Sequence, residues 1–141
     1  AFQDKKTYVA NTTIDLLNKD TSGLVKEVLT AEQFHGKQGE AVCVHRPDKA
    51  LAKRMYILGL GKKEEFAVDD IRRASGVFAK RFKKSIDSAS IVLPQELQKL
   101  GDTSELMQAI GEGLLLGIYD FSKYKEIVRR FHGVPFSVIC L

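Results

Sequence analysis

The feature that most constrains the fold is an apolar run that stops at a Gly-x-Gly turn and is followed by a charged loop and an amphipathic segment. The run covers residues 55–60, and the turn is Gly59-Leu60-Gly61. Beyond the loop, apolar or small residues recur at spacings of three and four, which places them on one helical face. A buried strand that leads into such a helix is typical of half a βαβ crossover. The helical face consists of Ile71, Ala74, Ser75, Phe78 and Phe82.

The ends of this helix are marked by charge. Asp69 has a carboxylate that can cap the first free backbone N–H groups, so we expect the helix to span residues 69–84. Positive side chains complement the dipole at a helix C-terminus. They are Lys80, Arg81, Lys83 and Lys84.

Further strands are predicted at residues 40–45, 88–93 and 136–141, where apolar side chains occupy consecutive positions. Such runs indicate burial on both faces, as in an α/β sheet covered by helices. Residues 36–39 predict a turn before the first of these strands. Two short helices are expected earlier, capped by Thr13 and Ser22 and separated by a loop at residues 18–23.

A helix over residues 104–119 carries three glycines, Gly111, Gly113 and Gly117. Each costs about 0.8–1 kcal/mol against alanine in a helix interior. Close packing on the sheet or on a neighbouring domain is the expected compensation, because a residue without Cβ lets two backbones approach. The predicted inner face consists of Leu106, Ala109, Ile110, Gly113, Leu114 and Gly117.

Length and composition indicate one soluble domain over residues 1–141. No apolar run approaches a membrane span and no leader opens the chain, so we expect a cytoplasmic protein or a targeting segment outside this sequence. Cys43 and Cys140 lie far apart in apolar runs, which favours buried reduced thiols over a disulfide. The net charge of +4 comes from residues 80–84 and 123–130. The first cluster is interpreted as a solvated helix end, although binding of nucleic acid would use both clusters if they shared one face.

The Gly-x-Gly turn does not complete a nucleotide-binding motif. Glu64 stands where the dinucleotide fingerprint needs its third glycine, and no Walker sequence follows Gly61-Lys62. Backbone N–H groups of such a turn can still hold an anion. Because Glu64 and Glu65 would repel an anion, a structural turn is favoured.

Other candidate residues also favour structural interpretations. His35, His45 and His132 have no metal-binding spacing, and Cys43 with His45 on one strand face gives only two ligands. Ser75-Gly76 lies within the predicted helix, without a nucleophile elbow. The pairs Glu64-Glu65 and Asp69-Asp70 are better explained by capping and solubility than by acid–base chemistry. No residue is therefore assigned as catalytic or metal-binding, and any ligand-binding residue is left open.

Two blocks of the sequence carry a family resemblance. Residues 59–66 with 69–74 read GLGKKEEF and DDIRRA, and residues 112–125 read EGLLLGIYDFSKYK. Together, in this order, they resemble the N-terminal domain of the M17 leucyl aminopeptidases, the cytosol aminopeptidase family. The resemblance covers nearly the whole chain. It implies a three-layer α/β/α domain with a mixed, mostly parallel sheet, similar to the macro domain.

The resemblance also implies a function for the parent protein. Members of the family release N-terminal amino acids, preferably leucine, from peptides, using two divalent metal ions, zinc or manganese. The catalytic groups and metal ligands belong to a C-terminal domain absent from this chain, so this domain is expected to be inactive and to hold no cofactor. Its expected partners are that catalytic domain and the other subunits of a homo-hexamer, with no membrane.

Three functions follow as hypotheses. The first is a non-catalytic domain that serves assembly, substrate access or regulation. The second is a macro-like module that binds ADP-ribose or another nucleotide at the carboxyl ends of the strands. The third is a DNA-binding accessory domain that uses the basic clusters.

Overall fold

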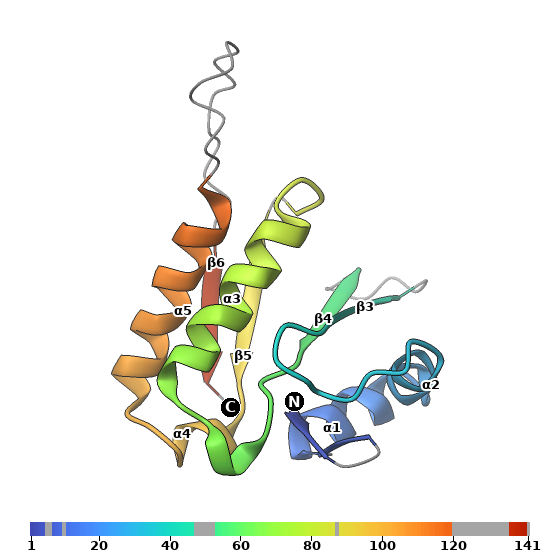
Figure 1. Ribbon diagram of the computed structural model, residues 1–141. Helices are drawn as coiled ribbons and strands as arrows, with labels where there is room; N and C mark the ends of the chain where they lie inside the picture. Colours follow the sequence, from blue (N-terminus) through green and yellow to red (C-terminus); the bar gives the residue numbers. More distant parts are fainter. Residues whose placement is uncertain (5–6, 10, 47–52, 87, 120–135, 141) are drawn as a thin grey trace. The chain divides into compact units, whose positions relative to one another are not determined.

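The computed structural model describes residues 1–4, 7–9, 11–46, 53–86, 88–119 and 136–140. The chain divides into two compact units, Ala1–Asp70 and Ile71–Leu141, and each is described by itself. Both units mix helices and strands, so the chain has the α/β character predicted from the sequence (Figure 1).

The first unit pairs its strands in two antiparallel hairpins. Phe2 lies opposite Val9 in one hairpin, and Ala41 lies opposite Leu58 in the other. A parallel bridge between Gln3 and Lys62 brings the first hairpin beside the chain that follows β4. The elements of this unit are β1 (Phe2–Gln3), β2 (Tyr8–Val9), α1 (Thr12–Asp20), α2 (Leu24–Ala31), β3 (Ala41–His45), β4 (Arg54–Leu58) and the 3-10 helix η1 (Lys63–Glu65).

The predicted caps of α1 and α2 are wrong. Asn11 caps α1, because its side-chain oxygen accepts a hydrogen bond from the Ile14 N–H at 2.8 Å, and Thr13 lies inside the helix. Gly23, in the left-handed region at φ +97°, precedes α2, and Ser22 makes no such cap. The predicted loop at 18–23 is also shorter than expected, because α1 continues to Asp20. Only a glycine adopts this φ without a steric penalty, so Gly23 sets where α2 begins.

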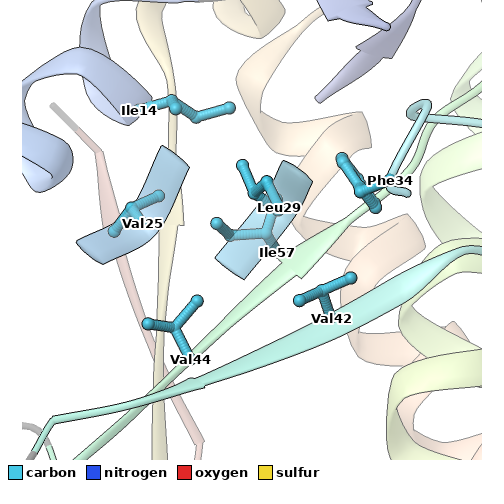
Figure 2. Close-up of a cluster of buried hydrophobic side chains, with 7 residues drawn as sticks. All are labelled: Ile14, Val25, Leu29, Phe34, Val42, Val44 and Ile57. Carbon is cyan, nitrogen blue, oxygen red and sulfur yellow. The ribbon is translucent and has the colours of Figure 1, made fainter. Parts of the chain in front are cut away.

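The core of the first unit lies between α1, α2 and the β3–β4 hairpin (Figure 2). The side chains of Val25 and Val44 are fully buried, and that of Leu29 is 1% exposed. Full burial of such side chains stabilises a fold by about 1.5–3 kcal/mol each. The cluster consists of Ile14, Val25, Leu29, Phe34, Val42, Val44 and Ile57.

The second unit contains the parallel strand pair. β5 and β6 run in parallel, with Ala89 opposite Phe136 and Leu93 opposite Cys140. Pro94 ends β5, as predicted, and directly precedes α4, which the sequence had not indicated. The elements are α3 (Val68–Phe82), which begins in the first unit, β5 (Ala89–Leu93), α4 (Gln95–Gln98), α5 (Thr103–Ile118) and β6 (Phe136–Cys140).

The start of α3 differs from the prediction by one residue. The helix begins at Val68, so Asp69 lies within its first turn instead of preceding it. Asp70 makes the capping contact, since its carboxylate accepts a hydrogen bond from the Ala67 N–H at 2.8 Å. Negative side chains in this turn also complement the helix dipole.

Among the described residues, no helix combines the length and the apolar character that crossing a bilayer demands.

Candidate functional site

The Gly-x-Gly turn after β4 has its backbone donors occupied. The N–H of Gly59 donates to the Glu40 carbonyl at 2.8 Å, and the N–H of Gly61 donates to the Gly36 carbonyl at 2.9 Å. Between them, the Leu60 N–H donates to the carbonyl of Ala1 at 2.9 Å. An anion held by a glycine turn needs such N–H groups to be free. This turn therefore joins three chain segments, which supports the structural interpretation.

Close approach of backbones explains the glycines of this turn. A Cβ at Gly59 would collide with the carbonyl oxygen of Lys37, and Gly61 has φ +77°. On the opposite side, Glu40 folds its carboxylate back to accept the N–H groups of His35 at 2.9 Å and Lys37 at 3.1 Å. The Glu40 N–H also donates to the Lys37 carbonyl at 3.0 Å, which confirms the predicted turn at residues 36–39.

The candidate metal ligands do not assemble into a site in the part of the chain described. Cys43 Sγ and His45 Nδ1 lie 3.8 Å apart on β3, as the strand alternation predicted. The Cys43 thiol is free and half-buried, not buried as expected. No group of three or more His, Cys, Asp or Glu side chains comes together among the described residues. His132 and the side chain of Cys140 lie outside those residues.

One carboxylate of each neighbouring pair, Glu65 and Asp70, has a local partner. Glu65 Oε1 lies 2.7 Å from Lys62 Nζ, and this hydrogen bond raises the pKa of Lys62. Asp70 caps α3, as described above. These contacts are those expected of capping and surface ion pairs.

The first basic cluster lies at the end of α3. Lys80, Arg81 and Lys84 are exposed, while Lys83 Nζ donates to the carbonyl oxygen of Ile118 at 3.1 Å. Lys83 thereby satisfies a terminal carbonyl of α5. The second cluster, residues 123–130, lies outside the described residues.

α3 and α5 pack side by side through their glycines (Figure 1). A Cβ at Gly113 would collide with the carbonyl oxygen of Arg72, and one at Gly117 with the carbonyl oxygen of Gly76. The inner face of α5 predicted from the sequence is confirmed residue by residue, since all six positions are buried. The predicted packing partner of these glycines is wrong. They pack against a neighbouring helix, α3, whereas a sheet or another domain was expected. Ser75 is buried at this contact.

A network of polar side chains links α3 and α5. Arg72 Nε donates to Glu112 Oε2 at 2.7 Å, and the Gln108 amide donates to Glu112 Oε1 at 2.8 Å. These two hydrogen bonds, first that from Gln108 and then that from Arg72, lower the pKa of Glu112. No local sequence pattern indicated this network, because Arg72 and Glu112 come from different helices.

The exposed side of α5 becomes more apolar along its length. Ser104, Glu105 and Gln108 are exposed in the first turns, together with Met107, which is 40% exposed. At the other end, Leu115 is 72% exposed and Leu116 is 69% exposed, followed by Tyr119 at 62%. We call Leu115, Leu116 and Tyr119 the α5 patch. The signal in the sequence was that leucines occupy positions that the helical pattern assigns to solvent.

These features define an α/β domain whose glycine motifs serve backbone packing and whose helix α5 carries an exposed apolar patch. Comparison with known proteins then identifies the family. The sequence profile of the N-terminal domain of the cytosol aminopeptidase family matches residues 1–127. The chain belongs to this family, as its N-terminal domain, which confirms the resemblance found in the sequence.

Individual relatives agree with this assignment. The chain is 41% identical over 112 residues to a probable cytosol aminopeptidase of Aquifex aeolicus, covering 78% of this chain and 22% of the relative. It is 32% identical over 114 residues to a probable cytosol aminopeptidase of Alkaliphilus metalliredigens, covering 81% of this chain and 23% of the relative. The chain thus spans about a quarter of the length of the relatives it matches.

Solved structures show the same fold. A tomato leucine aminopeptidase mutant, K354E, superimposes with a TM-score of 0.75 at 19% identity, over 96% of this chain and 26% of that chain. The bottromycin maturation enzyme BotP in complex with Mn gives a TM-score of 0.57 at 19% identity, over 78% of this chain and 22% of that chain.

Proposed function

We propose that this chain is the non-catalytic N-terminal domain of a leucyl aminopeptidase and that it contributes to assembly, substrate access or regulation. The observation that carries the proposal is the family match over residues 1–127, combined with relatives of which the chain covers only 22–23%. In this proposal, hydrolysis of the N-terminal peptide bond belongs to the downstream part of the parent enzyme.

The proposal assigns the metal ions to that downstream part as well. A two-metal site of zinc or manganese needs several carboxylate or imidazole ligands close together. The described residues do not fit such a group, because no three of these side chains meet among them. BotP, which shares the fold, was solved in complex with Mn, and the part of BotP that matches this chain is 22% of its length.

The architecture and setting of the domain are part of the same proposal. Both compact units would belong to one three-layer α/β/α domain of the macro type, with the β5–β6 pair contributing parallel strands to a mixed sheet. The parent would be a cytoplasmic homo-hexamer acting on peptides. The names of the relatives support the cytoplasmic setting and the action on peptides, and the superposition on tomato leucine aminopeptidase supports the α/β architecture.

A chimera tests the proposal directly. This chain would replace the matching N-terminal segment of the Aquifex aeolicus relative, and hydrolysis of leucine 4-nitroanilide would be measured with manganese or zinc added. We expect turnover from the chimera and none from the present chain alone. Turnover by the isolated chain, or a chimera that is folded but inactive beside an active parent enzyme, would contradict the proposal.

A further inference from the structure

Gly111 is a glycine of α5 whose missing side chain the folded chain does not explain. Gly113 and Gly117, in the same helix, lie against carbonyl oxygens of α3, where a Cβ would collide. A Cβ at Gly111 would meet nothing within 4 Å, and the residue lies inside a regular helix, whose backbone angles any residue adopts. A glycine in a helix interior lowers the stability of the helix, so a packing reason is expected. No such reason is present in the described part of the chain.

Gly111 lies on the side of α5 that faces away from α3. Successive residues of an α-helix are turned by about 100°, so Gly111 is about 200° around the axis from Gly113, which contacts α3 (Figure 1). Four residues before and after Gly111 stand Met107, which is 40% exposed, and Leu115, which is 72% exposed. Residues four apart are neighbours on one helical face. We call Met107, Gly111 and Leu115 the Gly111 face.

The Gly111 face has the composition of a helix–helix contact. Two large apolar side chains flank a position without a Cβ, which lets the backbone of another helix approach between them. Ser104 and Ile118, seven residues before and after Gly111, continue the same side of the helix. None of these positions is charged. The carboxylate of Glu112, the next residue after Gly111, is directed to Arg72 of α3 instead.

The symmetry of the face about Gly111 indicates what covers it. If two copies of α5 cross in antiparallel orientation at Gly111, the residue four before the glycine in one copy lies opposite the residue four after it in the other. Met107 would then contact Leu115 of the second copy, and Leu115 would contact Met107, as a self-complementary twofold interface requires. Ser104 and Ile118 would face each other in the same way. Because the face is uncharged, the twofold axis brings no like charges together.

We infer that the Gly111 face is the surface through which two copies of this chain associate, as an antiparallel pair of α5 helices that cross at Gly111. The inference does not depend on the proposed function, because it concerns only the contact between two copies of this domain. It supplies the packing reason for the glycine. It also covers Leu115, which has the largest exposed fraction among the large hydrophobic side chains described.

Disulfide trapping tests the register of this pair. Met107→Cys and Leu115→Cys would be prepared as separate variants, mixed and oxidised, and the linked peptides would be identified by mass spectrometry so that the native cysteines are read separately. In the inferred pair, equal positions of the two copies are about 12 Å apart along the helices, which is beyond the reach of a disulfide. We expect the mixture to form a disulfide between positions 107 and 115, and each variant alone to form at least tenfold less disulfide at its own position.

Leu116→Cys is the matched control for accidental collision. Leu116 is 69% exposed, similar to Leu115, but lies about 100° further around the helix. Mixed with Met107→Cys, it should give at least tenfold less cross-link than Leu115→Cys gives. Equal cross-linking of Met107→Cys with both variants would overturn the inference.

Sedimentation velocity measures the association without a cross-link. The unmodified chain should pass from monomer to dimer as its concentration rises. Gly111→Leu should stay monomeric at the same concentrations, because a large side chain at the crossing point keeps the helices apart. Since the space beside Gly111 is open, this variant should keep the circular dichroism spectrum of the unmodified chain. Leu116→Gln, which changes a residue outside the Gly111 face, should associate as the unmodified chain does.

Two results of this measurement would overturn the inference. The first is an unmodified chain that stays monomeric at every concentration, which would leave the Gly111 face to a different partner. The second is a Gly111→Leu variant that dimerises as strongly as the unmodified chain, which would place the contact elsewhere on the surface.

Discussion

The backbone of Gly113 in α5 lies against the carbonyl oxygen of Arg72 in α3, with no room for a Cβ between them. Glycine at this position lowers the intrinsic stability of α5 and at the same time allows the helix pair to approach. The side chain of Arg72 then reaches Glu112, the residue next to Gly113, at 2.7 Å. The same turn of α5 thus supplies both the close approach and the ion pair.

Substituting alanine for Gly113 and for Gly111 in α5 should change the free energy of unfolding in opposite directions. Gly113→Ala should lower the free energy of unfolding by about 1–3 kcal/mol, because the added methyl group forces the helices apart. Gly111→Ala is the matched control, since a Cβ there meets nothing within 4 Å. It should raise the free energy of unfolding by about 0.8–1 kcal/mol. Urea unfolding followed by circular dichroism measures both, and equal stability of the two variants would contradict the close packing.

The turn after β4 should not bind phosphate groups. Its three N–H groups already donate to backbone carbonyls, so ADP-ribose and inorganic phosphate should leave the thermal unfolding midpoint unchanged. A saturable upward shift with ADP-ribose, absent in a Gly61→Ala variant, would show that the turn binds a nucleotide. Calorimetric titration of the same ligand gives an independent reading.

Glu112 should titrate below the ordinary range of a glutamate. Hydrogen bonds from Gln108 and Arg72 lower its pKa from 4.5 in the folded chain. A carboxylate with a lowered folded-state pKa contributes stability above the unfolded pKa and loses it as the pH falls through the folded value. The stabilisation should therefore be present above 4.5 and decline below it.

Two measurements check this titration. Carbon-detected NMR should place the midpoint of Glu112 below 4.5. The Glu112→Gln variant should lose part of the acid-dependent destabilisation, and the difference should be small because the pair is partly exposed to solvent. A midpoint at or above the ordinary value would show that the network does not form in solution.

The start of α1 offers a direct comparison of two residues. Asn11→Ala should lower the free energy of unfolding by about 1 kcal/mol, because the Ile14 N–H loses its acceptor. Thr13→Ala should change it by less, since Thr13 lies inside the helix and makes no cap. Chemical denaturation of both variants checks the assignment, and a larger loss for Thr13→Ala would reverse it.

Periodic segments were the part of the fold that the sequence predicted well. The buried face of α5 was correct at each of its six positions, because helical spacing alone decides which side chains share a face. The strands at β3, β4 and β5 were placed within one or two residues for a similar reason, since their ends are marked by Gly or Pro. These signals are local and need no knowledge of the partner.

The sequence alone did not decide which residues cap the helices or which segments pack against the glycines. Asn11, Thr12 and Thr13 are adjacent residues that can all accept a backbone hydrogen bond, so composition does not choose among them. The close contacts of Gly59 with Lys37 and of Gly113 with Arg72 join segments far apart in sequence. Those contacts depend on tertiary packing, which a single sequence does not encode in any local pattern.

For the candidate site, the sequence mainly predicted that the Gly-x-Gly turn does not bind a ligand. The sequence indicated that the Gly-x-Gly turn is structural, and its occupied N–H groups agree. The α5 patch was not predicted, although the leucines at outward positions were a visible departure from the helical pattern. Recognising it required the exposure of these side chains in the folded chain.

In the proposed function, peptide hydrolysis belongs to a part of the parent enzyme outside this chain. To test this, the chain would be purified, its content of zinc and manganese measured, and leucine 4-nitroanilide hydrolysis followed as each metal is added. We expect no stoichiometric metal and no turnover above that of buffer. Turnover that rises in proportion to tightly bound metal would contradict it.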